Sequence, residues 1–206
     1  MQRVKKVIDQ IVEAPQPALP AKQAVRPHVT PPAIQRAVQP SSSFITQDYL
    51  DYIKTAENRS RVGFEKGRWY PHKDPSGGWN VGYGHHLTDS EYQSISKYGL
   101  SNQEVENFLI QDLVAAHRKV HDYITKKYGV KLHLTPKQDQ MLVDYVFNLG
   151  SLSSFPKMVD AIVRSDREKM GKEYKRSAVI NGKRKEITGR NTQFANKFLS
   201  QAESLA

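Results

Sequence analysis

The sequence predicts an α+β fold, in which a small N-terminal lobe with a β-sheet is joined by a long helix to an all-helical C-terminal lobe. In residues 61–87, glycines alternate with aromatic residues, a pattern typical of short antiparallel strands linked by tight turns. From residue 101 onward, apolar residues instead recur at helical spacing. A chain of 206 residues is long enough for one domain of this kind with its own hydrophobic core.

Proline is concentrated near the N-terminus. Seven of the eleven prolines lie within the first forty residues, where aromatic residues are scarce. Such a segment cannot bury enough apolar surface to fold alone, so we expect residues 1–43 to form an extended arm and residues 44–206 the folded domain. Residues 1–13 have apolar side chains at helical spacing, which fits either a short helix that docks on a partner or an unstructured segment.

The small lobe is predicted to span residues 44–100. Thr46 or Asp48 is a typical N-cap for a helix whose apolar face continues to about Asn58. Residues 61–87 follow as an antiparallel sheet.

Two helices are expected after the sheet. Thr88 begins a short helix that stops at Gly99. Ser101 and Glu104 match a capping box, in which a serine is followed three residues later by a glutamate, and so indicate the start of the long helix. The apolar face of that helix continues until Gly129.

Further helices are predicted for the C-terminal lobe, residues 101–206. Thr135 followed by Pro136 places a proline in the first turn of a helix that closes at Gly150. The remaining predicted helices span residues 156–165, 166–177 and 191–204.

The net charge of +10 is concentrated at the two ends of the chain. Residues 1–43 carry six basic and two acidic side chains, residues 44–156 thirteen of each, and residues 157–197 twelve basic and five acidic. A basic terminal segment suits nucleic acid, an anionic membrane or an anionic cell-wall polymer. Because no nucleic-acid-binding motif accompanies the basic clusters, we predict no nucleic-acid partner.

Composition excludes several classes of site and segment. The absence of cysteine excludes disulfides, thiolate zinc sites and a cysteine nucleophile. No apolar run approaches the roughly 18 residues that a membrane span needs. Acidic residues interrupt the start of the chain, where a signal peptide would need an apolar core. We therefore predict neither a membrane span nor a signal peptide.

We considered three interpretations of residues 72–86, HKDPSGGWNVGYGHH: a zinc site, a phosphate-binding loop and a turn that displays a carboxylate. His72, His85 and His86 suggest zinc, but neighbouring histidines on a strand point to opposite faces and cannot easily share one ion. A phosphate-binding loop would need a lysine and a further glycine that this stretch lacks. The third interpretation is a turn that displays the carboxylate of Asp74. We favour this one, and predict no metal and no cofactor.

If the chain cleaves glycosidic bonds, Asp74 needs a partner. One carboxyl group must protonate the leaving oxygen, while another activates water or stabilises the cationic transition state. Glu57 lies at the end of an apolar-faced helix, where partial burial would raise its pKa and keep it protonated. Glu65, in the stretch GFEKGRW, is followed by the basic residues Lys66 and Arg68 and resembles part of a solvated turn. Glu57 is therefore favoured, and Glu65 stays the alternative acid.

The order of these residues resembles the phage-type lysozyme, or muramidase, family. That family places a helix ending in a catalytic Glu before a sheet with an Asp and a signature ending in Gly-Tyr-Gly-His. This chain has Glu57, then Asp74, then GGWNVGYGHHL. The family's long helix and second-lobe core helix are similar to GLSNQEVENFLIQDLVAA and LTPKQDQMLVDYVFNLGSL. The resemblance covers roughly residues 47–200 and implies a lysozyme-like two-lobe fold.

The resemblance implies a role for each catalytic residue. Glu57 would be the acid, while Asp74 would stabilise positive charge and, with Asn80, position water. Asn80 stands where the family usually has threonine, and its amide can also donate and accept hydrogen bonds. An insertion at residues 59–69 would explain why Glu57 and Asp74 are farther apart in the chain than in compact family members.

Other positions also match the family. His85 corresponds to a histidine that pairs with an aspartate on the long helix, for which Asp112 is the matching position, and we expect this pair to be structural. Trp79 and Tyr83 either line the cleft, since aromatic rings stack on sugar faces, or pack in the core. Asn148 is expected to border the substrate site.

The resemblance further implies peptidoglycan as the partner, with cleavage of the β-1,4 bond between N-acetylmuramate and N-acetylglucosamine. A lytic transglycosylase of the same fold and an inactive lysozyme-like binding protein stay open as alternatives. Such an enzyme would act from a phage virion, with residues 1–43 bound to a phage structural protein. Alternatively, it would be an endolysin that is held in the host cytoplasm before release to the cell wall.

Overall fold

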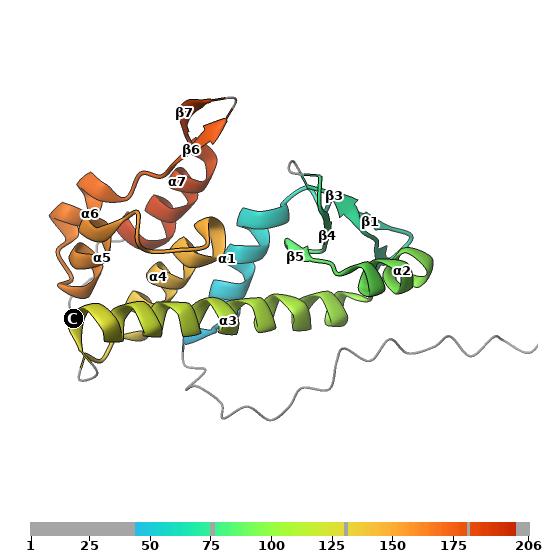
Figure 1. Cartoon of the computed structure of the whole chain (residues 1–206), viewed down its shortest axis with the longest axis horizontal. Coiled ribbons are helices and arrows are strands. Elements are labelled where there is room, and N and C mark those ends of the chain that lie inside the picture. Colours follow the sequence, from blue (N-terminus) through green and yellow to red (C-terminus); the bar gives the residue numbers. More distant parts are fainter. Residues whose placement is uncertain (1–43, 75–76, 130–131, 181, 201–206) are drawn as a thin grey trace, which may run out of the picture. The chain divides into compact units, whose positions relative to one another are not determined.

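The computed structural model of the protein describes residues 44–74, 77–129, 132–180 and 182–200. The predicted arm, residues 1–43, lies outside these residues, as does the end of the last predicted helix. Figure 1 shows the long helix α3 (Asn102–Tyr128) running past both the strands β1–β5 and the C-terminal helices. The fold is α+β, as predicted. Among the described residues, no helix is both long and apolar enough to cross a membrane.

Helix α1 (Gln47–Asn58) begins and ends where the sequence predicts. The side chain of Thr46 accepts a hydrogen bond from the backbone N–H of Tyr49 and so caps the first turn. Tyr49, Leu50 and Ile53 are buried and join the larger hydrophobic cluster, which consists mainly of residues from the helical lobe. Helix α1 therefore precedes the sheet in the chain but packs with the helices, although the sequence grouped it with the small lobe.

Five short antiparallel strands follow α1. They are β1 (Phe64–Glu65), β2 (Arg68–Trp69), β3 (His72–Lys73), β4 (Trp79–Val81) and β5 (His85–His86). The first two pair with each other, and the other three form a sheet with β4 in the centre. The register places Asn80 between His72 and His86. Gly82, at φ +64°, turns the chain so close to α3 that a Cβ would lie 2.1 Å from Val105 Cγ1, an approach that only glycine allows.

Capping boxes begin the next three helices. These helices are α2 (Asp89–Tyr98), α3 and α4 (Pro136–Leu149). In each, a Thr or Ser side chain accepts from a backbone N–H in the first turn, and a Glu or Gln side chain accepts from the N-cap backbone N–H. The predicted box of Ser101 and Glu104 is confirmed. Helix α4 ends at Gly150, as predicted.

Helix α3 contributes to both hydrophobic clusters of the domain. Val105 and Phe108, near its start, belong to the smaller cluster with residues of the sheet and α2. Leu113, Val120 and Ile124 belong to the larger cluster with α1 and α4. The other buried members of the smaller cluster are Trp69, Val81, Ile95 and Leu100. One continuous helix therefore links two separate cores, which is the physical basis of the two-lobe arrangement.

The C-terminal lobe is not all-helical, contrary to the prediction. Its helices after α4 are α5 (Pro156–Val163), α6 (Arg167–Glu173), α7 (Thr188–Phe194) and the π-helix η2 (Ala195–Leu199). Between α6 and α7, strands β6 (Ser177–Ile180) and β7 (Lys183–Glu186) form an antiparallel hairpin. The missed signal is the dipeptide Asn181-Gly182, because Asn-Gly favours the two-residue turn of a hairpin. Gly182 has a φ of +73°, which suits such a turn.

Candidate active site

Glu57 lies in the last turn of α1, where it meets α7. Its side chain is 21% exposed, and its Oε1 lies 2.8 Å from Arg190 Nη1. This is an ion-pair distance, although no N–H of Arg190 is aimed at that oxygen with hydrogen-bond geometry. Burial raises the pKa of Glu57, and the positive charge of Arg190 only partly offsets this effect. The site therefore favours the protonated carboxyl group, as a general acid requires.

Arg190 also belongs to a buried ion-pair network centred on Asp144 of α4. Arg176 Nη2 and Arg190 Nη2 donate to the two carboxylate oxygens of Asp144 over 2.5 and 2.6 Å. The Tyr52 hydroxyl donates to the same carboxylate over 3.0 Å. The charges of this network act on Glu57, since Asp144 raises the pKa of Glu57 while Arg176 lowers it.

Asp74, Asn80 and His86 gather on the three-stranded sheet. His86 Nδ1 lies 2.6 Å from Asn80 Oδ1 and 3.7 Å from Asp74 Oδ2. Asp74 Oδ1 accepts a hydrogen bond of 3.0 Å from the backbone N–H of Gly78. A Cβ on Gly78 would lie 2.8 Å from Asp74 Oδ2 and 2.6 Å from His86 Cε1, so a larger residue would displace both side chains. The turn thus holds a carboxylate and an amide beside one imidazole.

His85 on β5 contacts Asp112 on the long helix α3. His85 Nδ1 lies 2.9 Å from Asp112 Oδ2, and the His85 ring stacks on Phe108 with centroids 4.1 Å apart. His86 has different partners, as expected for neighbouring residues of one strand. The contact ties β5 to α3, as a structural role for the pair would require.

The three residues predicted to bind substrate have different surroundings. Trp79 is half-buried, stacks on Tyr92 with centroids 4.5 Å apart, and has Lys73 Nζ 4.1 Å from its ring centroid. Tyr83 packs against both hydrophobic clusters, in line with the alternative of core packing. Asn148 Oδ1 is buried without a hydrogen-bond partner among the described residues.

Glu65, the alternative acid, lies on β1 and is exposed to solvent. It faces Arg68 in the register of the β1–β2 hairpin. This hairpin falls within residues 59–69, where the sequence suggested an insertion. An exposed carboxyl group lacks the burial that favours protonation of Glu57, so the geometry favours Glu57 as the acid.

Sequence analysis missed Arg190 and Asp144 as neighbours of Glu57, and His86 as the neighbour of Asn80. One signal for the ion-pair network was present, because Asp144 interrupts the apolar run MLVDYVF. An aspartate inside such a run is rarely buried unless it is paired, so buried cations were to be expected. Which cations they are depends on how α7, which carries Arg190, and the segment between α6 and β6, which carries Arg176, pack against α4.

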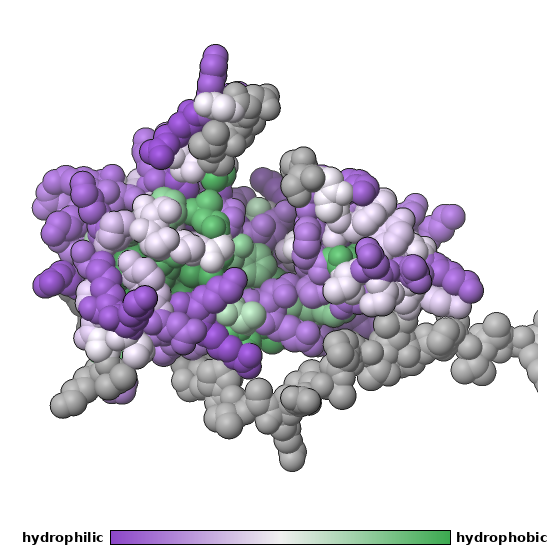
Figure 2. Space-filling model, in the orientation of Figure 1, coloured by the Kyte–Doolittle hydropathy of each residue, from purple (hydrophilic) through white to green (hydrophobic). Residues whose placement is uncertain are grey.

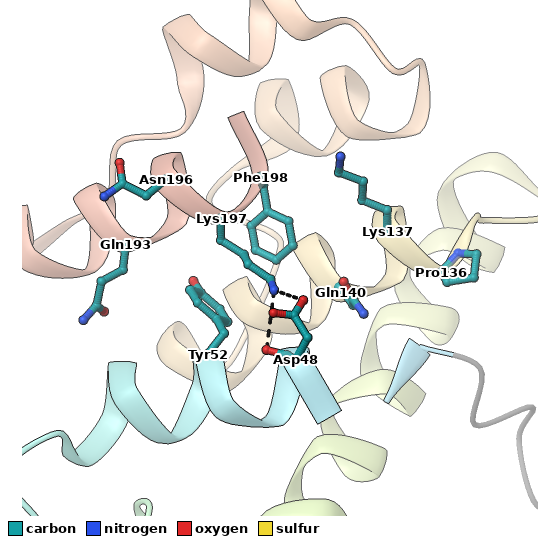
Figure 3. Close-up of a pocket in the computed structure, with 9 residues that line it drawn as sticks. All are labelled: Asp48, Tyr52, Pro136, Lys137, Gln140, Gln193, Asn196, Lys197 and Phe198. Atoms are coloured by element: carbon teal, nitrogen blue, oxygen red, sulfur yellow. Dashed lines mark hydrogen bonds and ion pairs between the residues drawn. The ribbon is translucent and has the colours of Figure 1, made fainter. Parts of the chain in front are cut away.

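The surface is hollowed between the C-terminal lobe and the sheet (Figure 2). Figure 1 places the end of α1 and strands β3–β5 opposite α7 and the β6–β7 hairpin, and Figure 2 shows the hollow between these groups. A different pocket, of about 600 Å³, is lined by residues of α1, α4, α7 and η2 (Figure 3). Lys197 points across it and pairs with Asp48. Neither Glu57 nor Asp74 lines this pocket, so it is not the candidate catalytic site.

The raised pKa of Glu57 predicts a measurable titration. We expect carbon-13 NMR of glutamate-labelled protein to show Glu57 titrating above the ordinary range of about 4.3, because burial disfavours its charged form. A general acid works while protonated, so activity should fall as the pH rises through this raised pKa. In Arg190→Gln the pKa should rise further, because a nearby positive charge is lost. Titration of Glu57 at or below the ordinary value would contradict this account.

Comparison with known proteins identifies the family to which this chain belongs. A family model described as phage lysozyme matches residues 62–192, well over half of the chain. The chain therefore belongs to the phage lysozyme family, a class of lysozyme enzymes, as the sequence predicted. Asp74, Asn80 and Arg190 lie within the matched residues, whereas Glu57 lies just before them.

Individual proteins are also similar to this chain. The peptidoglycan hydrolase gp36 of Enterobacteria phage SP6 is 30% identical over 114 residues, which cover 50% of this chain and 12% of that protein. The chain thus spans only a small part of this relative. The endolysin from Escherichia coli O157:H7 phage FAHEc1 has a similar fold, with a TM-score of 0.50, 16% identity, and coverage of 75% of this chain and 92% of its own. The muramidase domain of SpmX from Asticaccaulis excentricus aligns with a TM-score of 0.47, 21% identity, and coverage of 76% and 98%.

Proposed function

We propose that this chain cleaves the β-1,4 bond between N-acetylmuramate and N-acetylglucosamine in peptidoglycan, with Glu57 as the general acid. The observation that carries the proposal is the half-buried carboxyl group of Glu57, whose pKa is raised at the end of α1. In a member of the phage lysozyme family, the acid is expected at the end of this helix. The name of the phage SP6 relative, a peptidoglycan hydrolase, supports the same substrate class.

The proposed reaction begins with proton transfer from Glu57 to the glycosidic oxygen, while the bond from that oxygen to the anomeric carbon breaks. Positive charge develops on the sugar, and the carboxylate of Asp74 stabilises it. Water then adds to the anomeric carbon and gives up a proton to Asp74 or to solvent. Asn80 orients that water, and His86 fixes the Asn80 amide through their 2.6 Å contact.

A lytic transglycosylase of the same fold is the second candidate function. Asn80 Oδ1 lies 2.6 Å from His86 Nδ1, and this contact engages one of the two lone pairs through which the oxygen could hold a water. In a transglycosylase, a hydroxyl group of the sugar itself attacks, and no ordered water is needed. Mass spectrometry of the products separates the two reactions, because a 1,6-anhydro end is lighter than a hydrolysed end by one water molecule.

A zymogram containing purified peptidoglycan tests the proposed function directly. We expect clearing around the folded protein and none around the Glu57→Gln variant. A wild-type protein that binds peptidoglycan but produces no clearing and no soluble fragments would reject the enzyme. That result would instead support the remaining alternative, an inactive lysozyme-like protein that only binds peptidoglycan.

The exposed basic hairpin is proposed to attract the anionic cell wall. Lys183, Arg184 and Lys185 lie on β7, whose residues are all exposed, and the hairpin projects from the surface in Figure 1. If each makes one exposed ion pair of about 0.5 kcal/mol, replacing all three by glutamine weakens binding to wall polymer by about tenfold at low salt. The loss should shrink at high salt, where such pairs are screened. Sedimentation of the protein with isolated sacculi measures it.

A matched control removes the same charge elsewhere. Arg118, Lys119 and Lys126 are exposed on α3, and replacing them by glutamine changes the net charge equally. The hairpin explanation predicts a smaller loss of binding for this control. Equal losses in the two triple variants would show that net charge alone, and not the hairpin, drives the attraction.

We propose a phage virion as the setting in which this enzyme acts. The proline-rich composition of residues 1–43 favours a tether that lets an attached enzyme move, which a freely released endolysin does not need. A phage structural protein would then be the partner of this arm. Mass spectrometry of purified particles tests the setting, and absence of the protein from them would favour the endolysin alternative.

A further inference from the structure

Three potential metal ligands meet outside the candidate active site. His117 and His121 lie on α3, and Asp139 lies in the first turn of α4. The Nε2 atoms of the two histidines are 3.1 Å apart. Asp139 Oδ1 lies 3.2 Å from His117 Nε2 and 3.8 Å from His121 Nε2. Three different side chains therefore direct one ligand atom each toward a common point.

The spacing of these atoms suits a metal ion. Ligands bound at about 2.0–2.1 Å to a tetrahedral zinc ion lie roughly 3.3 Å from one another. The three separations in the structure, 3.1, 3.2 and 3.8 Å, fall around that value. The i, i+4 spacing of His117 and His121 places both imidazoles on one face of α3, which a single ion requires.

Burial supplies a second, independent observation. Asp139 is 9% exposed and His117 is 4% exposed. Asp139 Oδ1 nevertheless accepts no hydrogen bond among the described residues, although buried carboxylate oxygens are normally satisfied. A bound cation would satisfy this oxygen and both nitrogens at once. The ring of His117 is held in place by stacking on Phe44, with centroids 4.3 Å apart.

We propose that His117, His121 and Asp139 bind one divalent transition-metal ion of the zinc class. Two imidazole nitrogens and one carboxylate oxygen are ligands that zinc accepts. The side chain of His121 is 51% exposed, so solvent reaches the cluster and water completes the coordination. The ion would join α3 to α4 and thereby strengthen the larger hydrophobic cluster. The sequence prediction of no metal rested on the histidines of residues 72–86, and the signal that it missed is the i, i+4 spacing of the two histidines in HRKVH.

Titration of zinc chloride into the metal-stripped, full-length protein tests the site. Isothermal titration calorimetry at about pH 7.5, where an ordinary histidine is neutral, should give one zinc ion per chain. With free zinc about 100-fold above its dissociation constant, the melting temperature should rise by about 5–10 °C. Cobalt in place of zinc should give the absorption bands of a tetrahedral ion.

Two variants and a control decide the outcome. His121→Ala and Asp139→Asn should each weaken zinc binding by at least about tenfold, since even residues that only orient a ligand contribute about 10–100-fold. His133→Ala, at an exposed histidine outside the cluster, should leave the affinity unchanged. Absence of saturable binding, or equal affinity in His121→Ala and wild type, would overturn the proposal. Because His121 is half exposed, its alanine variant decides the matter even if Asp139→Asn does not fold.

Discussion

Replacing Glu57 by glutamine is expected to lower kcat/KM on peptidoglycan by about 10²–10⁴-fold, the usual contribution of a general acid. Glutamine has nearly the same shape and fits the same half-buried position beside Arg190. It cannot, however, release a proton to the glycosidic oxygen. Turbidity loss of a peptidoglycan suspension measures the rate. A melting curve close to that of the wild type would show that the fold is intact.

Glu65→Gln is the matched control for this prediction, because it makes the same chemical change at an exposed carboxyl group. Its rate should stay within about twofold of the wild type, as for most surface substitutions. Full activity in Glu57→Gln together with loss in Glu65→Gln would reverse the assignment of the acid. Asp74→Asn should also lose activity, since an amide carries no charge to stabilise the cationic transition state.

Asp144→Asn is expected to destabilise the domain by about 3–5 kcal/mol, which lowers the melting temperature by roughly 6–20 °C. The side chain of Asp144 is fully buried between the guanidinium groups of Arg176 and Arg190. Asparagine keeps the shape but removes the negative charge, so two buried cations lose their shared counter-ion. Thermal or urea unfolding measures the loss.

Asp48→Asn provides the comparison at the surface. Asp48 also pairs with a cation, Lys197, but its side chain is 85% exposed. Exposed pairs contribute about 0–1 kcal/mol, so this variant should unfold almost like the wild type. In the double variant Asp144→Asn/Arg176→Gln, removal of one buried cation should restore part of the stability. Equal stability of Asp144→Asn and Asp48→Asn would contradict the importance of the buried network.

The sequence by itself determined the elements that depend on local chemistry. Thr46, Ser101 and Pro136 mark helix starts through side-chain caps or a fixed φ, which involve only residues a few positions away. The small antiparallel sheet and the position of Glu57 at the end of an apolar-faced helix follow from the same local patterns. The resemblance to the phage lysozyme family then predicted that these elements form a two-lobe fold.

Only the tertiary structure decided which distant residues meet. Arg190 reaches Glu57 because α7 packs against α1, and His121 reaches Asp139 because α3 packs along α4. Local spacing contains no information about such contacts, whether the helices are consecutive, as α3 and α4 are, or far apart in the chain, as α1 and α7 are. The β6–β7 hairpin was missed for a different reason, since its Asn-Gly turn signal lies inside a basic run that also suits a solvated helix. The chemistry proposed for both sites therefore depends on helix packing, while the helices themselves follow from local sequence.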